Sequence, residues 1–229
     1  MYYFILIPII ISLITGLALI KHVKPVFLNS IIILLALTLA TEGIAIYFNL
    51  NPNTQKYINF VYNGFSLLDI TVWFYVFYKI HSKPKIRIFI LISSLLILAY
   101  SIIDLQFYQN WKFIHANSMR LYSLTIIFLS IVYLNGLLAI NYHNLFLNPF
   151  FYVCSACIMY HAVLFGNLTI LAENKNTYLA GVHDIFIILQ NIANCLYYFL
   201  LCCTFIVCYL TRHSKHPMVI PESSYSMDS

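Results

Sequence analysis

The stretch VHDIFIILQNIANCLYYFLLCCTFIVCYL, residues 182–210, decides the fold class of this chain. It is long and almost wholly apolar, so as a helix it can cross the roughly 30 Å of hydrocarbon in a bilayer. Its polar residues recur at steps of three and four, which is typical of one face of a helix and not of a strand. This face comprises His183, Gln190, Asn194, Tyr197, Thr204 and Cys208, joined by Ile187 and Leu201.

Six further apolar segments precede this one, separated by polar clusters and by prolines, which break helix interiors. The segments are Tyr3–Ile20, Val26–Phe48, Tyr57–Ile80, Ile86–Phe107, Leu121–Tyr142 and Phe150–Ala172. The chain is 62% hydrophobic and 8% charged, whereas ordinary globular domains carry about 25% charged residues. We therefore expect an all-α integral membrane bundle of seven transmembrane helices over residues 1–211, followed by a flexible cytoplasmic tail over residues 212–229.

The distribution of Lys and Arg predicts the orientation of this bundle. With the N-terminus outside and the C-terminus in the cytoplasm, eight basic residues lie inside and four outside, in agreement with the positive-inside rule. The inner residues are Lys21, Lys24, Lys79, Lys83, Lys85, Arg87, Arg212 and Lys215. The outer residues are Lys56, Lys112, Arg120 and Lys175.

These basic residues lie beside apolar segments and do not form a patch among polar residues. The formal net charge of +5 therefore reflects topology signals and contacts with the lipid bilayer, and nucleic-acid binding is excluded. The abundance of Ile, Asn, Tyr, Phe and Leu suggests an AT-rich bacterial genome. We expect a multi-pass protein of the bacterial inner (plasma) membrane.

Three carboxylates lie inside or at the rim of the apolar segments: Glu42, Asp69 and Asp104. A charge in hydrocarbon costs roughly 3 kcal/mol or more, so such residues usually face a bundle interior, a partner or a wet cavity. We expect Glu42 and Asp69 to hydrogen-bond with Asn, Gln, Tyr or His161, or to lie in water, and we favour a functional role for both. Asp104 lies near an interface and could simply be solvated.

Other polar residues of the spans converge on the same depth. Unpaired polar groups are costly in lipid, so these residues are expected to surround a polar cavity in the outer half of the bundle. The candidate ligand- or proton-binding residues are Glu42, Asn63, Asp69, Asp104, His161, Gln190 and Asn194. For the amides and hydroxyls alone, hydrogen bonding that holds membrane helices together is the better interpretation.

Neither the histidines nor the cysteines predict a metal site. Zinc needs converging ligands, and of the histidines only His161 is expected to lie deep in the bundle. All six cysteines fall in the last two apolar segments. The pair Cys154 and Cys157 has the spacing of a metal or redox motif but lies in an apolar run, so we expect packed thiols and no disulfides.

The chain resembles microbial rhodopsins and G-protein-coupled receptors in its expected topology of seven helices with the N-terminus outside. The first resemblance implies retinal on a lysine of the last helix, but residues 182–210 contain no Lys, so we expect no retinal and no other cofactor. The second resemblance implies an acidic residue followed by Arg at the end of the third helix. This chain has Tyr78-Lys79-Ile80-His81 there, so the receptor motif is absent.

Seven-helix zinc hydrolases of the ceramidase and adiponectin-receptor kind need three converging histidines, and the chain fails to match on ligand count. In composition the chain resembles small heptahelical membrane proteins of bacteria, a resemblance that implies no activity.

The favoured function is a membrane sensor or receptor component. A small ligand, lipid or proton would bind the outer cavity, and the cytoplasmic connections, especially Lys79–Arg87, would contact a partner protein or anionic lipid. One alternative is a proton or cation transporter or channel that uses Glu42 and Asp69. Others are an intramembrane, hydrolase-like enzyme and a structural subunit. The sequence leaves enzymatic activity open but favours a non-enzyme.

The predicted topology has a direct test. Reporters fused after His115 and at the C-terminus should report opposite sides of the membrane, because an odd number of spans separates them. Reporters on the same side would contradict the seven-span topology.

Overall fold

The computed structural model describes residues 3–20, 26–109, 111, 113–139, 145–173 and 180–213. These residues form seven α-helices and no strand, so the all-α prediction is confirmed. The helices are α1 (Tyr3–Leu19), α2 (Val26–Leu50), α3 (Ile58–Ile80), α4 (Pro84–Ile103), α5 (Ala116–Ala139), α6 (Pro149–Glu173) and α7 (Ala180–His213). Three short elements join them: the 3₁₀ turns η2 (Gln55–Tyr57) and η4 (Leu145–Leu147), and the π-helical turn η3 (Asp104–Gln109).

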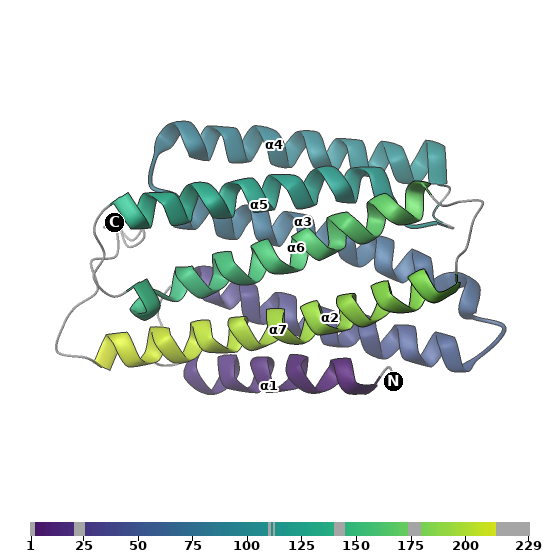
Figure 1. Cartoon of the computed structure of the whole chain (residues 1–229), viewed down its shortest axis with the longest axis horizontal. Helices are drawn as coiled ribbons and strands as arrows, with labels where there is room; N and C mark the ends of the chain where they lie inside the picture. The colour runs from purple at the N-terminus through teal and green to yellow at the C-terminus, as the bar shows by residue number, and fades with distance from the viewer. Residues whose placement is uncertain are drawn as a thin grey trace.

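The helices lie side by side as one elongated bundle (Figure 1). Each helix packs against its neighbours in the chain, and α7 closes the bundle by packing against α1. The helix α3 also contacts α5. Short connections favour this arrangement, because they leave each helix beside the one that precedes it.

Local sequence signals set several helix ends. The carboxamide of Asn148 accepts a hydrogen bond from the backbone N–H of Phe150 at 2.9 Å and so caps the start of α6. Pro84 opens α4 at a position where a missing N–H costs nothing. At the end of α3, the side chain of Arg87 donates to the carbonyl of His81 at 2.7 Å, which ties the start of α4 to the end of α3.

The outer surface of the bundle is apolar. Large hydrophobic side chains face outward on every side, among them Ile14 (60% exposed) on α1, Leu95 (70%) on α4 and Phe199 (61%) on α7. Within the described ranges, six helices are long and apolar enough to cross a membrane, whereas α1 is shorter. These features indicate a multi-pass membrane protein. The predicted orientation of the termini stays a prediction.

Most helix boundaries lie within a few residues of the predicted ones. The largest difference is at α5, which begins at Ala116 and not at Leu121. The predicted fourth segment ends as the π-helical turn η3. Of the predicted tail, Arg212 and His213 extend α7, and the remainder lies outside the described residues.

The interior of the bundle divides into two parts along its axis. One part is a fully buried apolar block that includes Leu28, Ile31, Trp73, Phe77 and Phe205. The other part, beyond this block, holds Glu42 of α2 and Asp69 of α3 and is polar. The apolar block thus forms the floor of the polar region.

Gly16 allows α1 to pack closely against α2 and α7. A Cβ at this position would lie 2.9 Å from Cγ1 of Ile32 and 3.1 Å from the ring of Phe205, whereas Gly43 has nothing within 4 Å of such a Cβ.

Gly16→Leu should therefore lower the thermal midpoint of the purified protein, at a cost of about 1–3 kcal/mol for overpacking. Gly43→Leu, the matched control, should leave the midpoint unchanged. Equal midpoints for the two variants would show that α1 does not depend on this contact.

Candidate functional site

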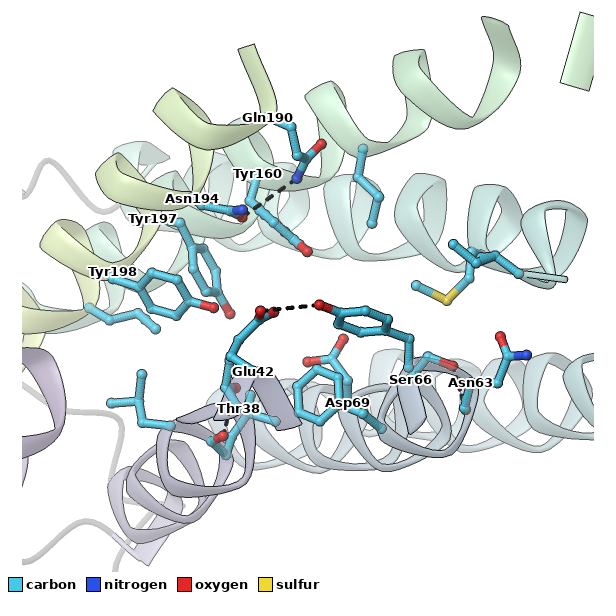
Figure 2. A pocket seen from close by; sticks show the side chains of 18 of the residues that line it. Thr38, Glu42, Asn63, Ser66, Asp69, Tyr160, Gln190, Asn194, Tyr197 and Tyr198 are labelled. Carbon is cyan, nitrogen blue, oxygen red and sulfur yellow. Dashed lines mark hydrogen bonds between the residues drawn. The ribbon is translucent and has the colours of Figure 1, made fainter. Parts of the chain in front are cut away.

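A cavity of about 330 Å³ lies among α2, α3, α6 and α7, with one wall completed by Ile114, His115 and Met119. Figure 2 shows its side chains converging from opposite helices. The polar residues that line it are Thr38, Glu42, Tyr62, Asn63, Ser66, Asp69, His115, Tyr160, Gln190, Asn194, Tyr197 and Tyr198. Several of these residues were predicted from the sequence to surround a polar interior, and its predicted position in the outer half stays a prediction.

Both carboxylates of the cavity accept hydrogen bonds from tyrosines. The hydroxyl of Tyr62 donates to Oε2 of Glu42 at 3.1 Å, and the hydroxyl of Tyr122 donates to Oδ2 of Asp69 at 2.9 Å. A carboxylate can accept about four hydrogen bonds. Each of the two therefore keeps capacity for a further donor inside the cavity.

A cluster of aromatic rings forms the wall opposite α2 and α3. The ring centroids of Tyr160 and Tyr197 lie 4.8 Å apart, and those of Tyr197 and Tyr198 lie 5.0 Å apart. Figure 2 shows the hydroxyl ends of all three rings directed toward the region around Glu42. Trp73 supports this wall from below through an edge contact with Tyr197 at 6.3 Å.

A row of amides runs along the junction of α6 and α7. Asn167 donates to Oε1 of Gln190 at 2.7 Å, and Gln190 in turn donates to Oδ1 of Asn194 at 3.5 Å. This direction of donation leaves the Nδ2 group of Asn194 as a donor beside the cavity, which Gln190 and Asn194 both line.

Asn63 attaches the segment before α5 to α3. Its Nδ2 group donates to the carbonyls of Trp111 and Phe113 at 3.3 and 2.9 Å. Trp111 has a φ of 60°, a conformation that a bulky residue adopts at a conformational cost, and these hydrogen bonds help to hold it. The Oδ1 atom of Asn63 is buried and has no partner among the described residues.

His115 is the centre of a buried hydrogen-bond chain at this end of the bundle. Its Nε2 contacts Oγ of Ser66, its Nδ1 lies 2.6 Å from Oγ of Ser118, and Ser118 lies 3.5 Å from Oδ2 of Asp104. Burial lowers the pKa of His115 to about 4, although the nearby Asp104 acts in the opposite direction. The imidazole is therefore neutral at pH 7.

The cavity thus brings together five of the seven residues that the sequence singled out. Glu42, Asn63, Asp69, Gln190 and Asn194 line it. The other two, Asp104 and His161, do not.

Asp104 is 1% exposed and belongs to the His115 chain, so it is not solvated as the sequence allowed. His161 is fully buried behind the aromatic wall, with its Nδ1 3.3 Å from Oγ of Ser123 and its ring edge-on to Tyr122 and Tyr160.

His161 is not the only buried histidine among the described residues. His115 is also fully buried and His81 is 4% exposed, because the connections that carry them fold against the ends of α3 and α5. The side chains of His183 and Asp184 lie outside the described part of the structure. Among described residues, no three His, Cys, Asp or Glu side chains are placed to hold a metal ion. All six cysteines are free thiols.

Sequence reasoning missed several residues of the site, above all Tyr62, Tyr122, Tyr160 and His115. The chain contains 19 tyrosines, so no single one stood out. His115 precedes Ser118 by three residues at the start of α5, and this spacing is a local signal that places the two side chains together. The contact of His115 with Ser66 is non-local and has no such signal.

Comparison with known proteins adds no identity to this site. No protein-family model, no curated protein and no solved structure matches the chain.

The His115 chain should contribute to stability through Ser118. Ser118→Ala leaves the buried Asp104 and His115 without this partner, at a cost of roughly 1–3 kcal/mol for the unsatisfied groups. We expect a lower thermal midpoint in detergent.

Ser130→Ala is the matched control, because Ser130 is a buried serine of the same helix that donates to the carbonyl of Ile126 and whose other partner is the weakly hydrogen-bonding thiol of Cys154. It should change the midpoint little. A Ser118→Ala midpoint equal to that of Ser130→Ala would contradict the role of the chain.

Proposed function

We propose that this protein is a ligand-binding sensor or receptor component of the bacterial plasma membrane. The bundle would cross the membrane seven times with its N-terminus outside, and a small ligand would occupy the cavity among α2, α3, α6 and α7. The observation that carries the proposal is the cavity of about 330 Å³, into which polar side chains from four helices converge. This volume is at the lower end of the range for small-molecule sites, about 300–1,000 Å³.

The floor of the cavity supports binding over transport. Leu34, Leu35 and Leu201 line the cavity toward the apolar block that includes Trp73 and Phe205. A transported proton or cation would need polar groups across this block. Ile206 of α7 does not belong to this floor, because it is 40% exposed on the outside of the bundle.

A hydrolase has one observation in its favour, the contact between Ser66 and His115. The direction of the hydrogen bonds argues against it. Ser66 donates to the carbonyl of Asn63 at 2.8 Å, so its single hydroxyl proton is directed away from Nε2 of His115. In this arrangement His115 does not accept that proton as a general base would. Labelling of Ser66 by a fluorophosphonate would favour the enzyme.

A conformational change on ligand binding would be transmitted to the cytoplasmic side through α3. This helix carries Asn63 and Asp69 in the cavity, and its other end packs against the start of α4 through the Arg87–His81 hydrogen bond. The same connection was expected from the sequence to contact a partner protein or anionic lipid. A shift of α3 on binding would change the surface that this connection presents.

The proposal is tested by screening the purified full chain in lipid nanodiscs for thermal shifts. The library consists of amino acids, amines, sugars, nucleosides and fatty acids. We expect saturable binding of one chemical class, weakened at least about tenfold in Asn194→Leu because that variant removes a hydrogen-bond donor of the cavity. Asn53→Leu, at an exposed position between α2 and α3, is the control and should bind as the wild type does.

Absence of saturable binding across the library would overturn the proposal. In liposomes, the protein should move neither protons nor small cations. A proton flux that Asp69→Asn abolishes would place the transporter first.

A further inference from the structure

We infer that the ligand of this cavity is an organic ammonium compound with an apolar or aromatic body. The inference rests on the proposed function and specifies its ligand class. Three features of the cavity support it independently: its charge, its aromatic wall and its unpaired acceptor.

The charge of the lining residues favours a cation. Glu42 and Asp69 both line the cavity, and none of the described residues that line it is Lys or Arg. His115 is the one lining residue that could carry a positive charge near neutral pH, and its lowered pKa keeps it neutral. A cationic ligand would compensate the cost of placing carboxylates in a low-dielectric bundle.

The tyrosines leave room for this ligand at the carboxylates. Tyr62 donates to one oxygen of Glu42, and Tyr122 donates to one oxygen of Asp69. These phenols fix the orientation of the carboxylates, and the remaining lone pairs can accept N–H groups of an ammonium.

The aromatic wall suits the same ligand. Tyr160, Tyr197 and Tyr198 line the cavity, with neighbouring centroids 4.8–5.0 Å apart. Aromatic rings attract ammonium groups that lie over their faces. Leucines from α2, α6 and α7 make up much of the remaining lining, which favours a compound with an apolar body over a polyamine or a bare metal ion.

The carboxamide of Asn63 supplies a further acceptor. Asn63 lines the cavity and is 1% exposed. Its Nδ2 group is fixed by two backbone carbonyls, so the unpartnered atom is the acceptor Oδ1. A buried acceptor without a donor is costly, and a ligand with N–H groups can satisfy it.

The experiment compares matched compounds on the purified full chain in nanodiscs, in phosphate buffer. Phenethylamine and benzyltrimethylammonium are the cationic probes, 2-phenylethanol is the neutral isostere and 3-phenylpropionate is the anion. We expect saturable thermal shifts for both cations, because the carboxylates and the aromatic faces attract a positive charge, and at least about tenfold weaker binding of the neutral and anionic compounds. The N–H groups of phenethylamine can in addition donate hydrogen bonds to the carboxylates, which benzyltrimethylammonium cannot do.

Variants then locate the interaction. Asp69→Asn and Glu42→Gln keep the shape of each side chain and remove its charge, and each should weaken phenethylamine binding at least about tenfold. Asp104→Asn removes the charge of a buried carboxylate that does not line the cavity, and it should leave the affinity unchanged. Equal losses in Asp69→Asn, Glu42→Gln and Asp104→Asn would overturn the inference.

Other outcomes separate this inference from the proposed function. If 2-phenylethanol or 3-phenylpropionate binds and the cations do not, the ammonium class is wrong and a ligand-binding cavity stands. If NaCl stabilises the wild type but not Asp69→Asn while the ammonium probes have no effect, the occupant is an inorganic cation. If no compound of this set or of the wider library binds, both proposals fail.

Discussion

Inside hydrocarbon, every polar side chain must find its hydrogen-bond partners within the protein, and this constraint shapes the whole bundle. The helices expose large apolar side chains on the outside, so their carboxylates, amides and phenols meet inside. The neutral hydroxyl of Tyr62 donates to Glu42, and that of Tyr122 donates to Asp69. Each phenol donates a single hydrogen bond and carries no charge. Both carboxylates therefore keep unused acceptor sites, which make the cavity suited to a ligand that donates hydrogen bonds.

The same constraint explains how the two ends of the bundle differ. Below Asp69 the interior is filled by packed apolar side chains such as Trp73 and Phe77. Above it, the segment that precedes α5 folds inward because Asn63 supplies hydrogen bonds to its backbone. A backbone without secondary structure can be buried against other helices only when its polar groups find hydrogen-bond partners. One asparagine therefore both completes a wall of the cavity and leaves a buried acceptor facing it.

Much of the fold could be predicted from the sequence because length and hydropathy determine where helices form in a membrane. The face of α7 that carries Gln190, Asn194, Tyr197 and Leu201 was visible from its spacing, and these residues line the cavity. Residue types that are rare in apolar runs, such as Glu42 and Asp69, drew attention to two of the residues that line the cavity.

The rest of the site depends on contacts between distant parts of the chain. Tyrosines are too common here for one to be selected without knowing which helix it faces. His115 lies in a connection, where a solvated position was the reasonable expectation, and only the folding of that connection onto α3 buries it. The size of the cavity also could not be predicted, because it is set by how side chains from separate helices fill space.

The unequal helix lengths have a consequence for how the protein responds to its lipid environment. The helix α1 has 17 residues and α7, which packs against it, has 34. The apolar part of α7, Ile187–Thr211, has 25 residues. At about 1.5 Å per residue, α1 is slightly shorter than an average hydrocarbon core and this apolar part of α7 is longer. Local thinning of the bilayer around α1 and tilting of α7 both reduce this mismatch. The packing between these two helices is therefore coupled to bilayer thickness, and a thicker or thinner membrane changes the strain that the α1–α7 contact bears.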